Sequence, residues 1–197
     1  MLDIENHFKL LDKVFEQFNL PFSIGFIKEI HKELMKDEEQ WDFETLPIPG
    51  QFKLFENFAI RSSGEIKSYL KPEEVENALE ELMEKTNSLI NSMDLRLIDN
   101  HPLTIAAYFH NQFLNVIHPF QDGNGRVGRI FTNLILLKCD LPPIFIDNTD
   151  TVEREKYLNT FIETEQKNSL VPMISYCGEK LLISLERKYT LIMEKLL

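Results

Sequence analysis

A chain of 197 residues can bury a hydrophobic core as one domain, without disulfides or structural metal. Its apolar fraction of 43% and charged fraction of 27% are those of an ordinary soluble globular protein. The formal net charge of −11 argues against a nucleic-acid partner and against an anionic membrane surface, because both need a basic protein face. We therefore expect no nucleic-acid and no membrane partner.

The N-terminal segment and the cysteines predict a cytoplasmic protein. The N-terminal segment carries acidic residues early and no continuous apolar run, so it predicts neither a signal peptide nor a membrane-spanning helix. Cys139 and Cys177 lie in apolar segments without zinc-ligand spacing, which is typical of two reduced core thiols. We expect a cytoplasmic protein, with later secretion as an effector left open; a homo-oligomer is compatible with the sequence.

The first part of the chain predicts two helices and a hairpin. Apolar residues three and four apart predict an amphipathic helix over residues 2–19, which Pro21 ends. Ser23 can cap a second helix with a buried stripe of Ile24, Ile27, Ile30 and Leu34. After a long connection, two short apolar runs flank the turn sequence RSSGE and predict a β-hairpin over about 55–70. Two strands alone are marginal in water, so this hairpin is a candidate working part; the alternative, a simple connecting hairpin, stays open.

Helices are predicted for the rest of the chain. Pro72 and the two glutamates after it are typical of a helix start. Residues 103–117 carry one helical stripe, whose members are Ile105, Phe109, Phe113, Val116 and Ile117. Residues 126–139 are apolar on nearly every side, as in the centre of a bundle, and 144–146 read as a short extended piece. Two helices follow, at about 152–167 and 172–197. The predicted fold is mainly α: a single-domain helical bundle over residues 1–197 with a small β-hairpin.

The loop between the two most apolar helices, residues 118–129, reads HPFQDGNGRVGR. Gly123 and Gly125 flank Asn124, so the backbone can approach a ligand closely. The amides at the start of the helix near Arg126 favour an anion, and Arg126 and Arg129 project from one side of its first turn. Because guanidinium groups bind phosphate as a fork, the loop predicts a polyphosphate site.

Two further side chains of this loop predict nucleotide chemistry. Asp122 suits a pure anion site only if Mg²⁺ bridges it to the phosphates, and Mg²⁺ commonly takes one or two carboxylates plus phosphate oxygens. His118 has a pKa suited to accepting a proton near neutrality. A polyphosphate, a metal ion and a nearby base together indicate nucleotide chemistry at a hydroxyl group.

The same twelve residues resemble the signature of the Fic-domain family, HPF-x-[D/E]-GNGR-x-x-R, at every specified position. The hairpin at 55–70, the lead-in AAYFHNQFLNVI, the exit LLKCDLPPI, the Tyr157 helix and the VPMI start of the last helix also resemble the family. The resemblance implies a Fic-like helical bundle with a flap hairpin, and transfer of AMP from ATP to a Ser, Thr or Tyr hydroxyl of a target protein.

By position, the resemblance implies a role for each residue of the loop. His118 would take the proton of the target hydroxyl, and Asp122 would hold Mg²⁺ between the α- and β-phosphates. Gly123, Asn124 and Gly125 would line the anion hole, with Asn124 also touching the α-phosphate. Arg126 would bind near the β-phosphate and Arg129 the γ-phosphate. The target would pair with the backbone of the flap.

One position of the motif bears on the reaction type. The related Doc branch, which phosphorylates its target, carries Lys where this chain has Gly125. Gly125 therefore favours nucleotidyl transfer, while UMP or GMP transfer stays open. A nucleotide-binding regulatory or scaffold domain, and removal of AMP from modified proteins, are the alternative functions.

Many members of the family carry an inhibitory helix with the pattern [S/T]-x-x-x-E-[G/N], whose glutamate pairs with the second arginine of the motif. Two segments fit five of its six positions, Ser175–Lys180 and Thr190–Lys195, and both have Lys at the last place. The second lies near the chain end, where such a helix would be, so Thr190 and Glu194 are the candidate inhibitory residues. A solvent-facing Glu194 with no such role is the alternative.

Overall fold

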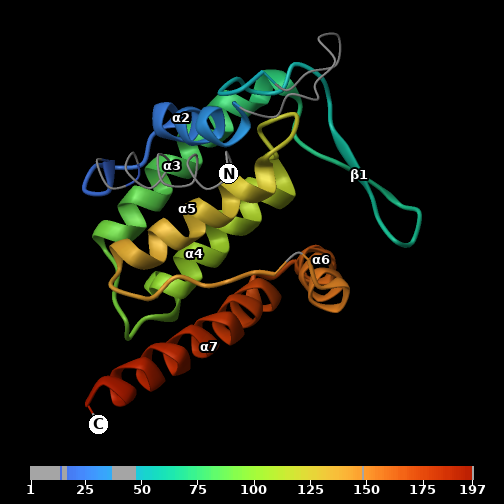
Figure 1. Cartoon of the computed structure of the whole chain (residues 1–197). Coiled ribbons are helices and arrows are strands. Elements are labelled where there is room, and N and C mark those ends of the chain that lie inside the picture. Colours follow the sequence, from blue (N-terminus) through green and yellow to red (C-terminus); the bar gives the residue numbers. More distant parts are fainter. Residues whose placement is uncertain (1–13, 15–16, 37–47, 148, 197) are drawn as a thin grey trace. The chain divides into compact units, whose positions relative to one another are not determined.

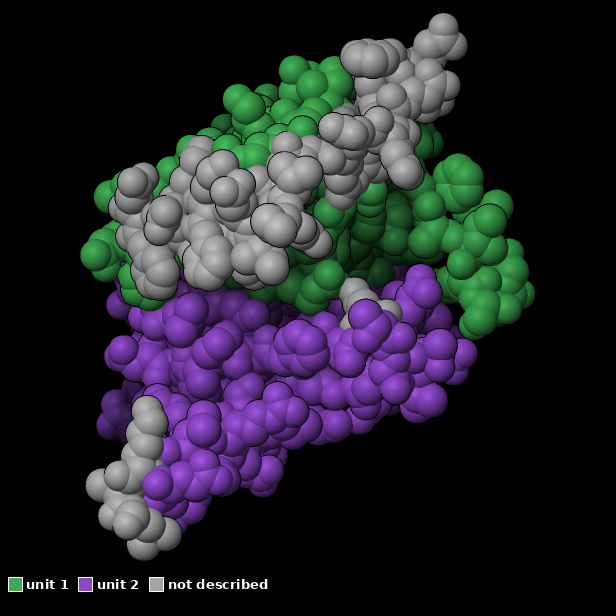
Figure 2. All heavy atoms as spheres, in the orientation of Figure 1, with its two compact units in different colours: residues 1–88, 112–130 green, residues 89–111, 131–197 purple. Residues whose placement is uncertain are grey.

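The computed structural model describes residue 14 and residues 17–36, 48–147 and 149–196. Contacts divide the chain into two compact units, coloured separately in Figure 2. Unit 1 consists of residues 1–88 and 112–130, and unit 2 of residues 89–111 and 131–197. The single domain over 1–197 stays a prediction, and the helix predicted at 2–19 lies almost wholly outside the described residues.

Unit 1 is built on helices α2 (Ile24–Met35) and α3 (Val75–Asn91). The Ser23 hydroxyl caps α2 by accepting from the amide of Phe26, as predicted. The side chain of Asn87 in α3 pairs with both backbone polar groups of Phe22, at 2.9 Å each, and so fixes the start of α2 against α3. The buried face of α2 is rotated from the predicted stripe: its buried residues are Phe26, Ile27, Ile30, His31 and Met35.

The predicted hairpin is present, with shorter strands than expected. Strands β1 (Phe58–Ile60) and β2 (Ile66–Ser68) pair antiparallel, Ile60 opposite Ile66. In the turn, Gly64 has a φ of 83°, a conformation that favours glycine. Figure 1 shows the hairpin projecting away from α2 and α3, and the 3₁₀ turn η1 (Pro72–Glu74) leads from it into α3.

The predicted helix at 103–117 is two elements. The α-helix α4 (Pro102–Asn111) belongs to unit 2, and the π-helix η3 (Gln112–Ile117) to unit 1. The wider turn changes which side chains face inward, so Val116, predicted as buried, is 38% exposed. Helix α5 (Asn124–Lys138) begins in unit 1 immediately after the motif loop and ends in unit 2.

In unit 2, helices α4 and α6 (Thr151–Gln166) both pack against α7 (Val171–Leu196). A buried network joins α4 to α6: the two ring nitrogens of His110 lie 2.7 Å from the Thr132 hydroxyl and 2.7 Å from the Tyr157 hydroxyl. The segment at 144–146 has the alternating burial of an extended chain, and Asn133 pairs with both backbone groups of Ile144. Cys139 and Cys177 are buried free thiols. No helix of the described residues is long and apolar enough to cross a membrane.

Candidate active site

The backbone that presents His118 is a π-turn. The amide of His118 donates to the carbonyl of Phe113 at 2.9 Å, which closes the last turn of η3, and His118 itself has a φ of 47°. A non-glycine residue in this left-handed region is strained, and both π-turns and such strain cluster at functional sites. The chain therefore stores strain at the residue predicted to be the base.

The hydrogen bond of the His118 ring selects one tautomer. Nδ1 lies 2.8 Å from the carbonyl oxygen of Leu114. A carbonyl can only accept, so Nδ1 carries the proton and Nε2 carries the lone pair. His118 thus offers a proton acceptor at Nε2, as general base catalysis requires.

The surroundings of His118 keep the imidazole neutral. The ring of Tyr69 is stacked on it, with centroids 4.0 Å apart and planes 16° apart. The pKa of His118 is lowered to about 4, mainly because the ring is buried. The bond to Leu114 opposes this effect, the charge of Lys53 adds to it, and Asp122 opposes it least. At neutral pH the ring is therefore ready to accept a proton.

The side chain of Asn124 closes the motif loop. Its Oδ1 accepts from the amide of Phe120 at 2.8 Å, and its Nδ2 donates to the carbonyl of the same residue at 2.7 Å. Asn124 is 2% exposed and Phe120 is fully buried. Asn124 therefore has a loop-building role that the sequence analysis did not predict for it.

Helix α2 contacts the motif loop through His31. The amide of Gly50 donates to His31 Nδ1 at 2.9 Å, so Nε2 carries the proton and donates to the carbonyl of Asp122 at 3.2 Å. The ring of His31 also stacks on Phe120, with centroids 3.7 Å apart. Burial lowers the pKa of His31 to about 4, which keeps both bonds intact at neutral pH. His31 is a neutral structural brace of the loop.

Gly123 of the motif loop lies close to Met35 and His31 of α2. Its φ is 75°, and a Cβ atom there would lie 2.9 Å from Met35 Sδ and 3.2 Å from two atoms of the His31 ring. Both the conformation and the space exclude a larger residue. The sequence predicted a glycine for ligand approach; the structure adds that α2 requires it.

The residues on both sides of the hairpin are bonded to the loop around His118. The amide of Lys53 donates to the carbonyl of Pro119 at 2.9 Å, and its Nζ donates to the carbonyl of Ile117 at 3.1 Å. Asn57 accepts from Lys53 Nζ and donates to the carbonyl of Phe120 at 2.9 Å. On the other side, the amide of Leu70 donates to the carbonyl of Val116 at 3.0 Å. We call Lys53, Asn57, Tyr69 and Leu70 the flap root.

The phosphate side of the loop is the N-terminus of α5. The first amides of a helix have no intrahelical acceptor, so those of Asn124 and Gly125 suit an anion. Arg126 Nη2 lies 3.1 Å from Met35 Sδ, and a Cβ at Gly125 would lie 3.3 Å from Arg129 Nη1. In the described part of the chain Arg129 forms no salt bridge. The helix start and both arginines lie in unit 1.

Asp122 fits a magnesium site completed by phosphate oxygens. It is exposed, and its Oδ1 accepts from the amide of Gly123 at 2.6 Å. The described residues hold no cluster of three metal-ligating side chains, so an all-protein metal cage is not indicated there. Mg²⁺ commonly uses one or two carboxylates and takes its other ligands from phosphate and water, which this single carboxylate allows.

Gly128 of α5 lies close to Leu114, the residue whose carbonyl binds the predicted base. A Cβ at Gly128 would lie 2.9 Å from Cγ and Cδ2 of Leu114. Leu114 carries the carbonyl that binds His118 Nδ1. The absence of a side chain at Gly128 therefore lets α5 pack closely on the π-helix at Leu114, whose carbonyl oxygen accepts the bond from His118 Nδ1.

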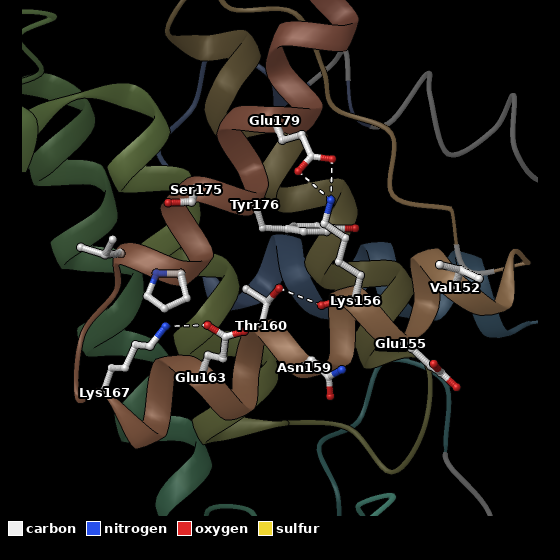
Figure 3. Close-up of a pocket in the computed structure, with 12 residues that line it drawn as sticks. Val152, Glu155, Lys156, Asn159, Thr160, Glu163, Lys167, Ser175, Tyr176 and Glu179 are labelled. Atoms are coloured by element: carbon white, nitrogen blue, oxygen red, sulfur yellow. Dashed lines mark hydrogen bonds and ion pairs between the residues drawn. The ribbon is translucent and has the colours of Figure 1, made fainter.

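The two candidate inhibitory segments lie on α7 in unit 2. Glu179, of the segment starting at Ser175, accepts from Lys156 with both carboxylate oxygens, at 2.6 and 2.7 Å. Figure 3 shows this pair in a groove of about 590 Å³ between α6 and α7. The Thr190 hydroxyl donates to the carbonyl of Glu186 at 3.0 Å, and Glu194 is exposed. Glu179 is thus engaged within its own unit, whereas Glu194 faces solvent.

Several functional residues were not found by sequence reasoning. They are the support of the loop and of the base: His31, Met35, Lys53, Asn57, Tyr69, Leu114 and Gly128. Only His31 carried a signal, a histidine within an apolar helical stripe. The others are ordinary residues whose roles follow from contacts distant in the sequence.

Comparison with known proteins agrees with this geometry. The model of the Fic/DOC family matches residues 21–136. The protein adenylyltransferase Fic of Nematostella vectensis is 38% identical over 81 residues, which are 41% of this chain and 18% of that protein. The Drosophila melanogaster protein of the same name is 32% identical over 104 residues, 51% of this chain and 20% of the relative. This chain therefore spans about a fifth of these relatives.

The fold has a solved counterpart. The crystal structure of a Fic-domain-containing signalling protein from Bacteroides thetaiotaomicron is similar with a TM-score of 0.78 and 24% identity. The similarity covers 93% of this chain and 69% of that one. With the complete motif and the mainly helical fold around its flap hairpin, the matched family model shows that this chain belongs to the Fic/DOC family.

Proposed function

We propose that this chain is a protein adenylyltransferase, which transfers AMP from ATP to a Ser, Thr or Tyr hydroxyl of a target protein. One observation carries the proposal: His118 offers an unprotonated Nε2 immediately before a helix N-terminus with two arginines. The names of the relatives from Nematostella vectensis and Drosophila melanogaster support the same activity.

The proposed reaction uses the groups of the motif in sequence. The ATP phosphates lie against the first amides of α5, where Arg126 and Arg129 balance their charge. Asp122 would hold Mg²⁺, which would offset negative charge on the ATP phosphates. His118 Nε2 accepts the proton of the target hydroxyl as its oxygen bonds to the α-phosphorus. The bond from the α-phosphorus to the bridging oxygen breaks, pyrophosphate leaves, and His118 returns its proton to solvent.

The flap is the proposed docking site for the target. Its strands expose Phe58, Ile60 and Ile66 by 62%, 70% and 63%. An extended target segment can add to an open strand edge through main-chain bonds, while these apolar side chains hold it in place. An open apolar edge otherwise favours aggregation, so its exposure supports a role in binding.

A brake by Glu194 is part of the same proposal. Arg129 lies near the positive end of the α5 dipole, so an anion stabilises it when no ATP is bound, and a glutamate can supply one. Glu194→Gly is expected to raise self-modification with labelled ATP. Glu179→Gly is the matched control, because Glu179 is bound by Lys156. Equal incorporation by the wild type and Glu194→Gly would remove the brake from the account.

The position of the label in ATP tests the reaction type. The purified chain and Glu194→Gly are incubated with ATP labelled at the α- or at the γ-phosphate, with Mg²⁺ and a lysate. Adenylyl transfer predicts incorporation of the α-label alone, and unlabelled UTP or GTP as competitors report the nucleotide preference. Incorporation of the γ-label would indicate phosphorylation, and ATP binding without incorporation a scaffold domain. Loss of preformed label would indicate AMP removal.

A further inference from the structure

The flap root links the proposed target-docking hairpin to the predicted base. Lys53 and Asn57 donate hydrogen bonds to the carbonyl groups of Pro119 and Phe120, respectively, which follow His118 in the chain. Leu70 donates to the carbonyl of Val116, which precedes His118. Tyr69 lies between Leu70 and the end of β2 and is half-buried. Its amide lies 3.4 Å from the carbonyl of Asn57, which joins the two sides of the root. The residues at both ends of the hairpin are thus bonded to the backbone around His118.

A single hydrogen bond does not fix an imidazole. The bond from Nδ1 to the Leu114 carbonyl holds one ring atom, and the ring can still pivot about it. A flat contact over the ring face removes this freedom, and Tyr69 makes one, at 4.0 Å and 16°. Aromatic pairs of this kind attract one another beyond the area that they bury. The bond and the stack together fix the direction of Nε2.

We propose that Tyr69 is a positioning residue for the reaction: its ring holds the His118 imidazole in the plane that aims Nε2 at the target hydroxyl. The proposal rests on the proposed function of His118 as base. It gives the flap root a second task, because the residue that follows the second strand of the docking hairpin also orients the base. Target docking and base alignment are then coupled through one side chain.

The direction of the effect follows from the geometry. Loss of the ring leaves His118 bonded to Leu114 yet free to turn, so the proton acceptor is misaligned in most molecules. Misplacement of a reacting group by about 1 Å costs on the order of 10²-fold in rate. The ring of Tyr69 stacks on His118, whereas the proposed ATP contacts are Arg126, Arg129 and the amides of α5, so ATP binding should stay unchanged.

The first test is kinetic, in chains that carry Glu194→Gly so that a brake does not hide the effect. Tyr69→Ala should lower kcat for AMP transfer by on the order of 10²-fold, with the KM for ATP unchanged. Tyr69→Phe keeps the stacking ring and should retain kcat. Phe145→Ala removes an aromatic ring that is 68% exposed in unit 2 and should leave both constants unchanged. An unchanged kcat in Tyr69→Ala would overturn the proposal, as would an equal loss in Tyr69→Phe.

The second test needs no turnover and separates this proposal from the proposed function. The Nδ1 proton of His118 is followed by NMR in chain with isotope-labelled histidine and is assigned by its absence in His118→Ala. The signal should persist in wild type and Tyr69→Phe, and broaden through exchange with water in Tyr69→Ala. A persistent signal in Tyr69→Ala would refute the positioning role even if the chain transferred no nucleotide. Broadening without AMP transfer by the wild type would instead refute the proposed function alone.

Discussion

Gly123→Ala should destabilise the fold through two separable effects. At a φ of 75° an L-residue pays about 1–2 kcal/mol for the left-handed conformation. The new Cβ would also lie 2.9 Å from Met35 Sδ and 3.2 Å from the His31 ring, and overpacking of this kind costs about 1–3 kcal/mol. The free energy of unfolding should therefore fall by about 2–5 kcal/mol.

Gly64→Ala is a matched control for the backbone effect. Gly64 has a φ of 83°, and nothing lies within 4 Å of a Cβ placed there. Gly64→Ala should lower the free energy of unfolding only through the left-handed conformation, by about 1–2 kcal/mol. Alanine also lowers the entropy of the unfolded chain, which reduces the loss of stability equally in both variants. The difference between the two variants, about 1–3 kcal/mol, measures the close approach of α2 to the loop.

Urea unfolding followed by circular dichroism gives both free energies. A Met35→Ala background should remove most of the difference, because the closest atom is then missing. An equal decrease of the free energy of unfolding in Gly123→Ala and Gly64→Ala would refute the reasoning that α2 packs directly against the motif loop.

Further predictions concern the buried histidines. Because the pKa of His118 is lowered to about 4, the AMP-transfer rate should stay level as the pH falls through 6.5 and decline only near 4, measured as a pH–rate profile. His31 and His118 both have pKa values near 4 in the folded chain and near 6.5 in the unfolded one, so the unfolded chain binds more protons between these values. The free energy of unfolding should therefore decrease as pH falls from 6.5 towards 4, and urea midpoints that stay constant over this range would contradict it. Tyr157→Phe removes the hydroxyl bonded to the buried ring of His110 and should cost about 1–3 kcal/mol in the same assay; a loss no larger than that of the exposed control Tyr189→Phe would contradict the network.

The helices and the hairpin were predictable because their signals are local. Apolar periodicity, the cap at Ser23 and the proline at 72 each depend on a few neighbouring residues, and the described residues have helices at the cap and after the proline. The motif could be chosen as the candidate site because its unusual residues are contiguous. For the same reason the resemblance to the Fic family could be read directly from the sequence.

The π-helix was not predictable, because residues 103–117 keep apolar spacing that also fits an α-helix. One wider turn exposes Val116 and gives His118 its φ of 47°, and only packing in three dimensions selects that turn. The predicted stripe of α2 was wrong by part of a turn, because the buried face also includes His31. Its buried bonds to Gly50 and Asp122 satisfy both ring nitrogens and make it a core residue.

The flap root was invisible to sequence reasoning for a different reason. Lys53 stands in the long connection and Asn57 in the predicted hairpin, and the carbonyl groups that they bind lie more than sixty residues away in the chain. Lys53 is 3% exposed, and burial lowers its pKa to about 8. A buried lysine of this kind is costly unless it is bonded, and the Ile117 carbonyl and the Asn57 Oδ1 accept from its ammonium group.

Intact-mass spectrometry of the purified chain after incubation with Mg·ATP tests the central claim most directly. The claim is that His118 Nε2 accepts the proton of a hydroxyl as AMP is transferred to it. Glu194→Gly should gain the mass of an adenylyl group, and the same chain with His118→Ala should gain none while it still binds ATP. An equal gain in both chains would contradict the role of His118, and no gain in Glu194→Gly, even with a lysate as target source, would contradict adenylyl transfer.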